Sequence, residues 1–545
     1  MIALADTAAK PIDGGIPPLH RVCYPPGDAT ILISSGIVWF APHYVHRLTH
    51  DKEFSQLIKP ERYVNFPGMD ANMKQLSGID ATFLYMETEQ TPMHVAGLTI
   101  YDLPKGFKGS FHKHFTEFFK TRVHLVPMFG MKLAKTAFQL DHPGWVDAGE
   151  IDFDYHIQSA KLPKPGTRKQ LEDMVAQLHA ERLDRKKPLW QFTVIEGLEG
   201  RQAALYSKVH HAAIDGGSGM VITQALYDLS EKPREVKPPE PKEKTRKPTE
   251  IERAILSVNN VMSNIMRQQL NILEAMPKML NQMADIVAPV LAGKVGLPQL
   301  LAPRTPFNVT VEAKRSFSAR SVSLIDAKAI AKATGAKLND VVLAATSGAL
   351  RAYLLRQQKL PDAALVAFVP ISLREMGNTD IRNQVFGMNV PLATNYGDPL
   401  KRLCKIQQES GASKAVAGSV KDAAPQDFTL VGAPTLLPGL MQLYGGSKLA
   451  DYIPQAVNLT ISNNMGPPFP LYCAGAPVKA LYPVSIPTHG VALNVTVNSY
   501  QANLDFGVTA DHKAVPDADD FADLIVASFE ELKQAVEKKA AKAGT

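Results

Sequence analysis

Residues 210 to 217 read His-His-Ala-Ala-Ile-Asp-Gly-Gly, and this segment places acid–base side chains at a spacing that chemistry can use. A histidine whose pKa lies near neutrality can take a proton from a hydroxyl group and return it to a leaving group. We therefore interpret His211 as a general base. Asp215 can hold the turn in shape through backbone hydrogen bonds or a partner arginine, and Gly216 permits a left-handed backbone.

The elements on either side of this segment would hold it in place. Residues 203–209 predict a buried strand, and residues 218–229 predict a helix. A strand-to-helix turn exposes a side chain at the end of a sheet, where open α/β folds keep their ligands. The alternative is a pair of satisfied structural histidines near a turn. A chance match to this pattern arises in roughly one of a thousand such sequences, so we favour catalysis.

The composition is that of an ordinary globular protein with two or more domains. The chain has 545 residues, of which 45% are hydrophobic and 21% are charged. A net charge of +6 is too small to argue for nucleic acid as a partner. It suits the anionic phosphates of coenzyme A or the surface of an acidic membrane.

The cysteines and the apolar runs bear on the compartment. Three scattered cysteines without a CxxC pair disfavour a disulfide framework and a zinc site, and they fit a reducing compartment. The first twenty residues lack the pattern of a secretory signal. The apolar run 31–41 is about half of what a membrane span needs. We expect a cytoplasmic protein whose membrane contact, if any, is peripheral.

Composition shifts divide the chain into four parts. Residues 1–72 show no periodicity or motif and are assigned no function, whereas 73–230 read as a mixed α/β subdomain. Residues 231–306 begin as a charged, proline-rich linker and continue as methionine-rich helices. Residues 307–545 form a second α/β subdomain.

Periodicity predicts alternating strands and helices in both subdomains. In the first we expect strands at 94–101, 151–157, 191–196 and 201–210, and helices at 110–122 and from Thr167 to 183. In the second we expect a helix at 326–334 that ends at Gly335, one from Asn339 to 356, and one at 519–538. The expected strands of the second are 316–324, 366–372, 457–462, 491–497 and 503–509.

The segment 210–217 resembles the HHxxxDG motif of coenzyme A-dependent acyltransferases and peptide-synthetase condensation domains. Further segments follow the order and spacing of the bacterial wax ester synthase/acyl-CoA:diacylglycerol acyltransferase family. They are LSGIDATFL (76–84), PLW (188–190), LND (338–340), RNQ (382–384) and SNNMGP (462–467). The resemblance runs from about residue 73 to about residue 521. It implies an α/β fold of two chloramphenicol-acetyltransferase-like subdomains, each a mixed sheet flanked by helices, with the active-site tunnel between them.

The family resemblance implies acyl transfer from a coenzyme A thioester to an alcohol. The second histidine of the pair, here His211 after His210, would be the general base, and Asp215 would be structural. Arg374 is one expected partner for that carboxylate. Asn339 matches the family's Asn-Asp pair and would donate to the oxyanion, although a helix N-cap explains an asparagine there equally well.

The resemblance is less informative about the acceptor. Val385, Phe386 and Met388 match a segment that would line the alcohol channel. Such a pocket discriminates by only about 1 to 3 kcal/mol per methylene group. We expect acyl-CoA and diacylglycerol as substrates and triacylglycerol as product, with long-chain alcohol and wax ester as the alternative.

The same resemblance implies neither a cofactor nor a metal, and it places the protein at the inner membrane face or at lipid droplets. A condensation domain is disfavoured because no carrier or adenylation module accompanies the motif. A non-catalytic lipid-droplet protein that uses the methionine-rich helices is the other alternative. The intact motif disfavours it, because a coat protein has no use for that turn.

Overall fold

The computed structural model describes residues 32–34, 37–39, 74–134, 142–214, 218–239, 301–372, 385–421 and 433–543. The chain divides into two compact units, 1–70 and 71–545, and each is described by itself. In the first unit, β1 (Leu32–Ser34) pairs antiparallel with β2 (Ile37–Trp39). Most of the predicted linker and all of the methionine-rich helices lie outside the described residues.

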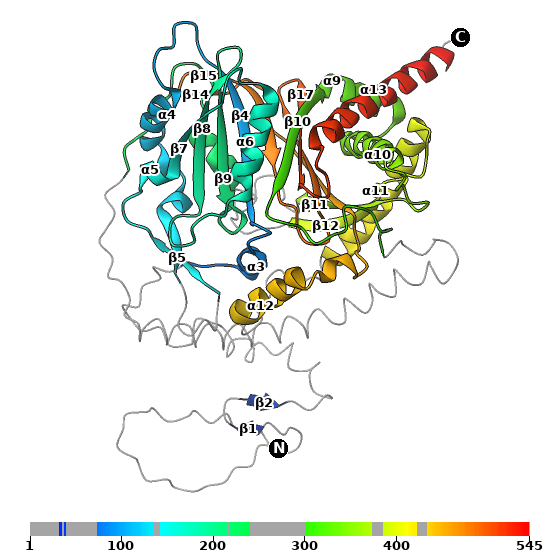
Figure 1. The fold of residues 1–545 in the computed structure, drawn as a ribbon, viewed down its shortest axis with the longest axis horizontal. Helices are drawn as coiled ribbons and strands as arrows, with labels where there is room; N and C mark the ends of the chain where they lie inside the picture. The colour runs from blue at the N-terminus through cyan, green and yellow to red at the C-terminus, as the bar shows by residue number, and fades with distance from the viewer. Residues whose placement is uncertain are drawn as a thin grey trace, which may run out of the picture. The chain divides into compact units, whose positions relative to one another are not determined.

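The first of two six-stranded sheets in unit 71–545 contains β9 (Gln202–His210) (Figure 1), so His210 lies at the end of a strand. The predicted strands at 191–196 and 201–210 are confirmed as β8 and β9, which pair antiparallel, and in this sheet only β7 runs parallel to its neighbour. The strands in spatial order are β14 (Tyr472–Cys473), β15 (Ala476–Val484), β4 (His94–Asp102), β9 (Gln202–His210), β8 (Trp190–Leu198) and β7 (Ile157–Lys161).

The second six-stranded sheet is built from residues of the second half of the chain. It is also mixed, because β13 runs parallel to both of its neighbours and the other pairs are antiparallel. All five strands predicted there are confirmed within a few residues. In spatial order the strands are β10 (Arg315–Ser323), β17 (Asn503–Asp511), β16 (Leu493–Tyr500), β13 (Leu459–Asn464), β11 (Val366–Ser372) and β12 (Val385–Pro391).

Residues 307–545 contribute to both sheets rather than to one. Strand β15 belongs to the second half of the chain but pairs antiparallel with β4 of the first sheet, with Leu481 opposite Thr99 in register. Strand β14 extends the same edge. A subdomain boundary drawn along the sequence at residue 307 therefore does not separate the two sheets.

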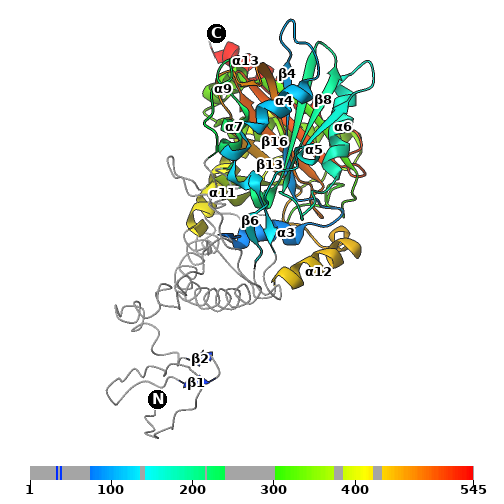
Figure 2. The ribbon, with the colours of Figure 1, turned by 90° about the vertical axis from the view of Figure 1, so that its left-hand side faces the viewer.

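Helices cover the first sheet and join it to the second (Figures 1 and 2). On the first sheet, α4 and α5 pack against β7 and β8, and α6 contacts β10 of the second. Helix α4 buries Phe111, Phe115 and Phe119. Helix α6 starts at Thr167 as predicted, where Thr167 forms a reciprocal capping box with Gln170. The helices of the first half are α3 (Gly78–Met86), α4 (Phe111–Lys120), α5 (Phe153–His156), α6 (Arg168–Ala180) and α7 (Ser218–Leu226).

Four of the five helices described in the second half of the chain contact the second sheet, whereas α12 contacts α3 and η7. Gly335 ends α9 as predicted, with a φ of 70° that a glycine adopts without strain. The helices are α9 (Leu324–Thr334), α10 (Leu338–Arg356), α11 (Pro399–Lys421), α12 (Ala433–Gly446) and α13 (Ala518–Ala543). Among the described helices, none has both the length and the apolar character needed to cross a bilayer.

The prediction of one strand at 151–157 is wrong. Asp152 caps a short helix, α5, by accepting a hydrogen bond from the Tyr155 backbone at 3.1 Å. Strand β7 begins only at Ile157, where the chain can pair with β8. The alternation of apolar residues therefore spans a helical turn and the start of a strand.

Short elements complete unit 71–545. A three-stranded sheet has the order β3, β6, β5, and 3₁₀ turns connect the larger elements. They are β3 (Lys74–Gln75), β5 (Met131–Ala134), β6 (Gly144–Asp147), η3 (Val123–Leu125), η4 (Pro127–Gly130), η6 (His211–Ala213) and η7 (Leu449–Asp451).

Candidate functional site

The two histidines lie at the predicted junction between a strand and a helix. His210 is the last residue of β9, His211 opens the turn η6, and helix α7 begins at Ser218. The His211 N–H donates to the carbonyl of Met93 at 2.8 Å, which ties the turn to the residue before β4. The sequence prediction of a strand-to-helix turn is therefore confirmed.

The imidazole of His211 is half-buried and packs against an aromatic ring. Phe83 of α3 stacks on it with 3.9 Å between the ring centroids and 16° between the ring planes. Burial lowers the pKa of His211 to about 4, so the ring is neutral at physiological pH. Its Nδ1 is buried and, among the described residues, has no hydrogen-bond partner other than the backbone of His211 itself. A neutral imidazole in this setting is chemically able to accept a proton.

His210 is fully buried, and its two ring nitrogens face the backbone of the turn and a carboxylate. Its Nδ1 accepts a hydrogen bond from the Ala212 N–H at 3.1 Å, which leaves Nε2 to carry the ring proton. That Nε2 lies 3.5 Å from Oε1 of Glu87, an ion-pair distance without hydrogen-bond geometry. His210 therefore connects the turn to a buried carboxylate.

Glu87 follows α3 directly and is held by an arginine. Its Oε2 accepts from Nε of Arg185 at 2.7 Å, and the same guanidinium donates to the carbonyl of Leu84 at 2.6 Å. Burial alone would raise the pKa of Glu87, but His210 and Arg185 outweigh it and lower that pKa to about 2. The carboxylate is thus ionised at every pH at which the protein would work.

A second group of buried basic side chains lies next to the turn but is committed to backbone carbonyls. His94, opposite His210 in the sheet, contacts the carbonyl of His179 at 3.0 Å through Nε2. Lys208 donates to the carbonyls of Leu178 and Glu181, at the end of α6. Burial lowers the pKa of Lys208 to about 8. We read this group as a connection between the sheet and α6.

Asn339 is the second residue of α10 and not its cap. The helix begins at Leu338, with Lys337 as the N-cap, so the expectation that Asn339 opens it is wrong by one residue. The carboxylate of Asp340 accepts the Lys337 N–H at 2.9 Å and the Ser410 hydroxyl at 2.7 Å. Capping therefore does not account for Asn339. No hydrogen bond links it to His211 among the described residues, and its role as an oxyanion donor stays a prediction.

The three predicted channel residues belong to strand β12. Val385 and Phe386 begin β12, where they pair in register with Ser372 and Ile371. Met388 is 8% exposed and belongs to the core of the second sheet. A role for these three residues in acceptor binding stays a prediction, as does the tunnel. Asp215, Gly216 and Arg374 lie outside the described residues.

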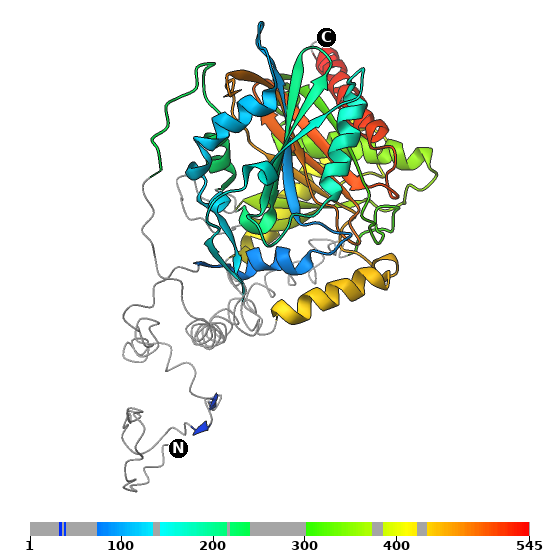
Figure 3. The ribbon, with the colours of Figure 1, turned by 60° about the vertical axis from the view of Figure 1, so that its left-hand side comes forward.

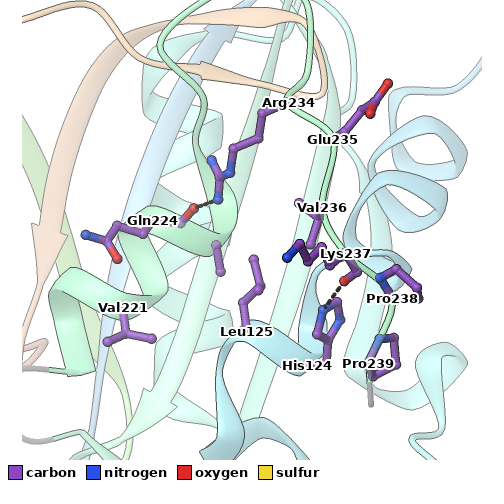
Figure 4. Close-up of a pocket in the computed structure, with 11 residues that line it drawn as sticks. His124, Leu125, Val221, Gln224, Arg234, Glu235, Val236, Lys237, Pro238 and Pro239 are labelled. Atoms are coloured by element: carbon purple, nitrogen blue, oxygen red, sulfur yellow. Dashed lines mark hydrogen bonds between the residues drawn. The ribbon is translucent and has the colours of Figure 1, made fainter. Parts of the chain in front are cut away.

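A cavity of about 540 Å³ lies beside α7, at a surface that the sequence did not indicate (Figure 4). Figure 4 shows His124 bonded to the backbone of Lys237, and Arg234 bonded to the backbone of Gln224. Neither histidine of the motif lines it. The lining residues are His124, Leu125, Val221, Gln224, Ala225, Arg234, Glu235, Val236, Lys237, Pro238 and Pro239.

Three residues around the histidines were not found from the sequence. Phe83 lies inside the LSGIDATFL segment, so the family motif could have indicated it. Glu87 and Arg185 carry no such signal, because they meet each other and His210 only in the fold. Within the described ranges, no group of three or more histidine, cysteine or acidic side chains could hold a metal ion.

Comparison with protein families covers most of the chain. The profile of the wax ester synthase/diacylglycerol acyltransferase catalytic domain matches residues 76–342, and the profile of the C-terminal domain of the same proteins matches residues 382–533.

Named relatives match over nearly their full length. O-acyltransferase WSD of Acinetobacter baylyi is 35% identical over 453 residues, which are 82% of this chain and 93% of the relative. A probable diacylglycerol O-acyltransferase of Mycobacterium tuberculosis is 33% identical over 463 residues, 84% of this chain and 98% of the relative.

Solved structures give the same result for the fold. The wax ester synthase/diacylglycerol acyltransferase of Marinobacter aquaeolei VT8 superposes with a TM-score of 0.61 at 28% identity, over 85% of this chain and all of that one. The first condensation domain of the calcium-dependent antibiotic synthetase reaches a TM-score of 0.50 at 12% identity, over 86% of this chain and 96% of that one. At that identity the likeness shows the fold alone.

Proposed function

Because the chain belongs to the wax ester synthase/diacylglycerol acyltransferase family, we propose that it transfers a long-chain acyl group from acyl-CoA to diacylglycerol, with His211 as the general base. The observation that carries the proposal is the state of the His211 imidazole. It is neutral, half-buried, stacked on Phe83 and anchored through its own backbone N–H. Its Nδ1 makes no hydrogen bond to any other described residue.

In this reaction His211 moves one proton. The acceptor hydroxyl oxygen attacks the thioester carbonyl while the imidazole takes the hydroxyl proton. The tetrahedral intermediate then expels the coenzyme A sulfur, and the imidazolium returns the proton to it. An imidazolium with a pKa of about 4 gives up its proton readily, which favours the second transfer. General base catalysis of this kind contributes about a hundred- to ten-thousandfold in rate.

The tetrahedral intermediate also needs hydrogen-bond donors for its oxyanion. We assign Asn339 to this role because it lies in the first turn of α10, where the helix dipole favours negative charge, and because it does not cap that helix. One such donor contributes roughly 3 kcal/mol to the stability of the transition state.

The acceptor follows from the relatives. Several are named diacylglycerol O-acyltransferases, which favours triacylglycerol as the product. The test supplies palmitoyl-CoA with equal amounts of dioleoylglycerol and hexadecanol and follows free thiol and product chromatography. We expect thiol release with triacylglycerol as the main product. Wax ester as the main product would transfer the assignment to the fatty alcohol, and no thiol release would favour the non-catalytic lipid-droplet protein.

Diacylglycerol resides in lipid, and α12 offers a surface that could meet it. The helix contains no charged residue. Leu436, Leu440 and Leu443 are spaced along one face of it and are 60%, 49% and 62% exposed. Helix α12 also contacts α3, the helix that carries Phe83. The two helices lie side by side in Figure 3. We assign the exposed leucines to the lipid interface, because apolar surface of this kind is stabilised by insertion below the headgroups.

Flotation with vesicles of phosphatidylcholine and diacylglycerol tests this assignment. Replacing Leu436, Leu440 and Leu443 together by serine is expected to lower the bound fraction severalfold. The matched control replaces Ile325 and Leu355, which are 67% and 49% exposed on other helices, and should bind as the unaltered protein does. Equal binding of the two variants would remove α12 from the interface.

A further inference from the structure

The Glu87 carboxylate joins the two backbone segments that hold His211. Its Oε1 accepts a hydrogen bond from the Met93 N–H at 3.4 Å, and the Met93 carbonyl accepts the His211 N–H at 2.8 Å. The same Oε1 faces Nε2 of His210, whose Nδ1 receives the Ala212 N–H. Oε1 of Glu87 thus binds the backbone of Met93, the residue before β4. It also faces the His210 ring, which bonds to the turn η6.

The surroundings keep this carboxylate charged and in place. The Glu87 side chain is 1% exposed, and Arg185 closes it off from solvent with hydrogen bonds to it and to Leu84. The α3 helix, whose C-cap is Glu87, also supplies Phe83, whose ring stacks on the His211 imidazole. Helix α3 therefore contributes the stacking partner of His211, and its C-cap residue contributes the anion behind His210.

We infer that Glu87 is a positioning residue for the acyl transfer, acting through His210 to fix the orientation of His211. Its negative charge favours the proton of His210 on Nε2, which leaves Nδ1 free to accept the Ala212 N–H. That bond and the bond from His211 to Met93 hold the turn, so the imidazole is presented at one angle. Glu87 itself touches no substrate. The inference rests on the proposed role of His211 as the base.

A purely structural ion pair between Glu87 and Arg185 would behave differently. In that case either partner could be removed with the same effect, and the effect would fall on stability. If Glu87 acts through His210, its carboxylate must matter more to turnover than Arg185 does. Arg185 is half-exposed, with a side chain 41% accessible, so its loss leaves the carboxylate still facing His210.

Steady-state kinetics with palmitoyl-CoA and dioleoylglycerol test the inference on the full chain. Glu87→Gln removes the charge but keeps an acceptor for the Met93 N–H. We expect kcat to fall by about ten- to a hundredfold, as small displacements of catalytic groups do, with KM for palmitoyl-CoA within about twofold. Glu89→Gln is the matched control. Its side chain is 79% exposed and meets only Arg182, at 3.7 Å, among the ion pairs of the described residues, so it should leave both constants unchanged.

Arg185→Gln separates the two explanations. Positioning through His210 predicts a smaller loss of kcat than in Glu87→Gln, whereas a structural ion pair predicts equal losses. Wild-type kcat in folded Glu87→Gln, or equal losses in the two variants, would overturn the inference. Should Glu87→Gln fail to fold, Glu87→Asp carries the test, because the shorter side chain keeps the charge and withdraws it from His210. A loss of kcat like that expected of Glu87→Gln then supports the inference, and wild-type kcat overturns it. His211→Ala, assayed alongside, shows separately whether His211 is the base.

Discussion

At the scale of single residues, burial controls the acid–base behaviour of His211. Burial disfavours the imidazolium and lowers the pKa to about 4, with a smaller contribution from His210. The neutral ring is the form that accepts a proton. Essentially all of the His211 imidazole is neutral above about pH 6, and this neutral fraction falls as the pH drops through the lowered pKa.

We therefore expect kcat/KM for palmitoyl-CoA to be level between pH 6 and 8 and to fall at lower pH with a midpoint near 4. The measurement is a pH–rate profile at saturating diacylglycerol. Each sample is returned to pH 7 afterwards, and recovery of the full rate excludes unfolding as the cause. A midpoint at the ordinary histidine pKa of about 6.5 would contradict the burial of the base.

The sequence predicts a site residue when the contacts of that residue are close in the chain, and it does not when those contacts are distant in the chain. His211 was identified because its motif is contiguous and its turn is bounded by a periodic strand and a helix. Glu87 and Arg185 were missed because their partners lie about a hundred residues away, and a lone carboxylate in a polar loop looks like a solvated one. Asn339 was expected as a cap, yet Lys337 takes that position because Asp340 bonds back to its N–H.

At the scale of elements, local signals predicted what local forces determine. Thr167 and Gly335 fixed helix ends correctly, since caps act within a few residues. Local sequence patterns did not predict β15, whose partner β4 is almost 400 residues earlier in the chain. They did not predict α11 and α12 either. It also merged α5 with the start of β7, because an apolar alternation over seven residues does not distinguish a capped turn from a strand.

The crossing of β15 makes one glycine essential to the contact between the sheets. A Cβ added to Gly507 of β17 would overlap the backbone carbonyl of Pro483 in β15. Backbone cannot yield as a flexible side chain does. We expect Gly507→Ala to lower the free energy of unfolding by about 2 to 3 kcal/mol, measured by urea unfolding.

The matched control is Gly411→Ala in α11, where nothing lies within 4 Å of the added atom. There the alanine should be neutral or stabilise by up to about 1 kcal/mol, because it favours the helix. An unchanged urea midpoint for Gly507→Ala would mean that the two sheets do not approach as closely as described.

At the scale of the whole of unit 71–545, α6 and the shared strands bind the two sheets into one structure. A hydrophobic cluster combines residues of the first sheet and α6 with Phe317 and Ala319 of the second. At its edge Glu172, 1% exposed, accepts from the Ser318 hydroxyl and the Ala319 N–H, both at 3.0 Å. Arg320 pairs with the same carboxylate at 3.2 Å.

Removing this charge should weaken the connection between the sheets. We expect Glu172→Gln to lower the free energy of unfolding by about 3 kcal/mol, because it leaves buried partners of the carboxylate without their anion. Asp173→Asn, at the next position, is the control, since its carboxylate is exposed and pairs with the exposed Lys169. Thermal unfolding that shows equal melting temperatures for the two variants would exclude Glu172 as an important link.

Acyl transfer by this protein is proposed to depend on proton transfer by His211. The most direct measurement compares the rate of acyl transfer in His211→Ala with that of the unaltered protein. The assay uses palmitoyl-CoA and dioleoylglycerol, and His124→Ala, which changes a histidine outside the motif, serves as the control. We expect His211→Ala to fold normally and to lose at least a hundredfold in kcat, while the control keeps its full rate. A folded His211→Ala that transfers acyl groups within about twofold of the unaltered rate would contradict the assignment of the base.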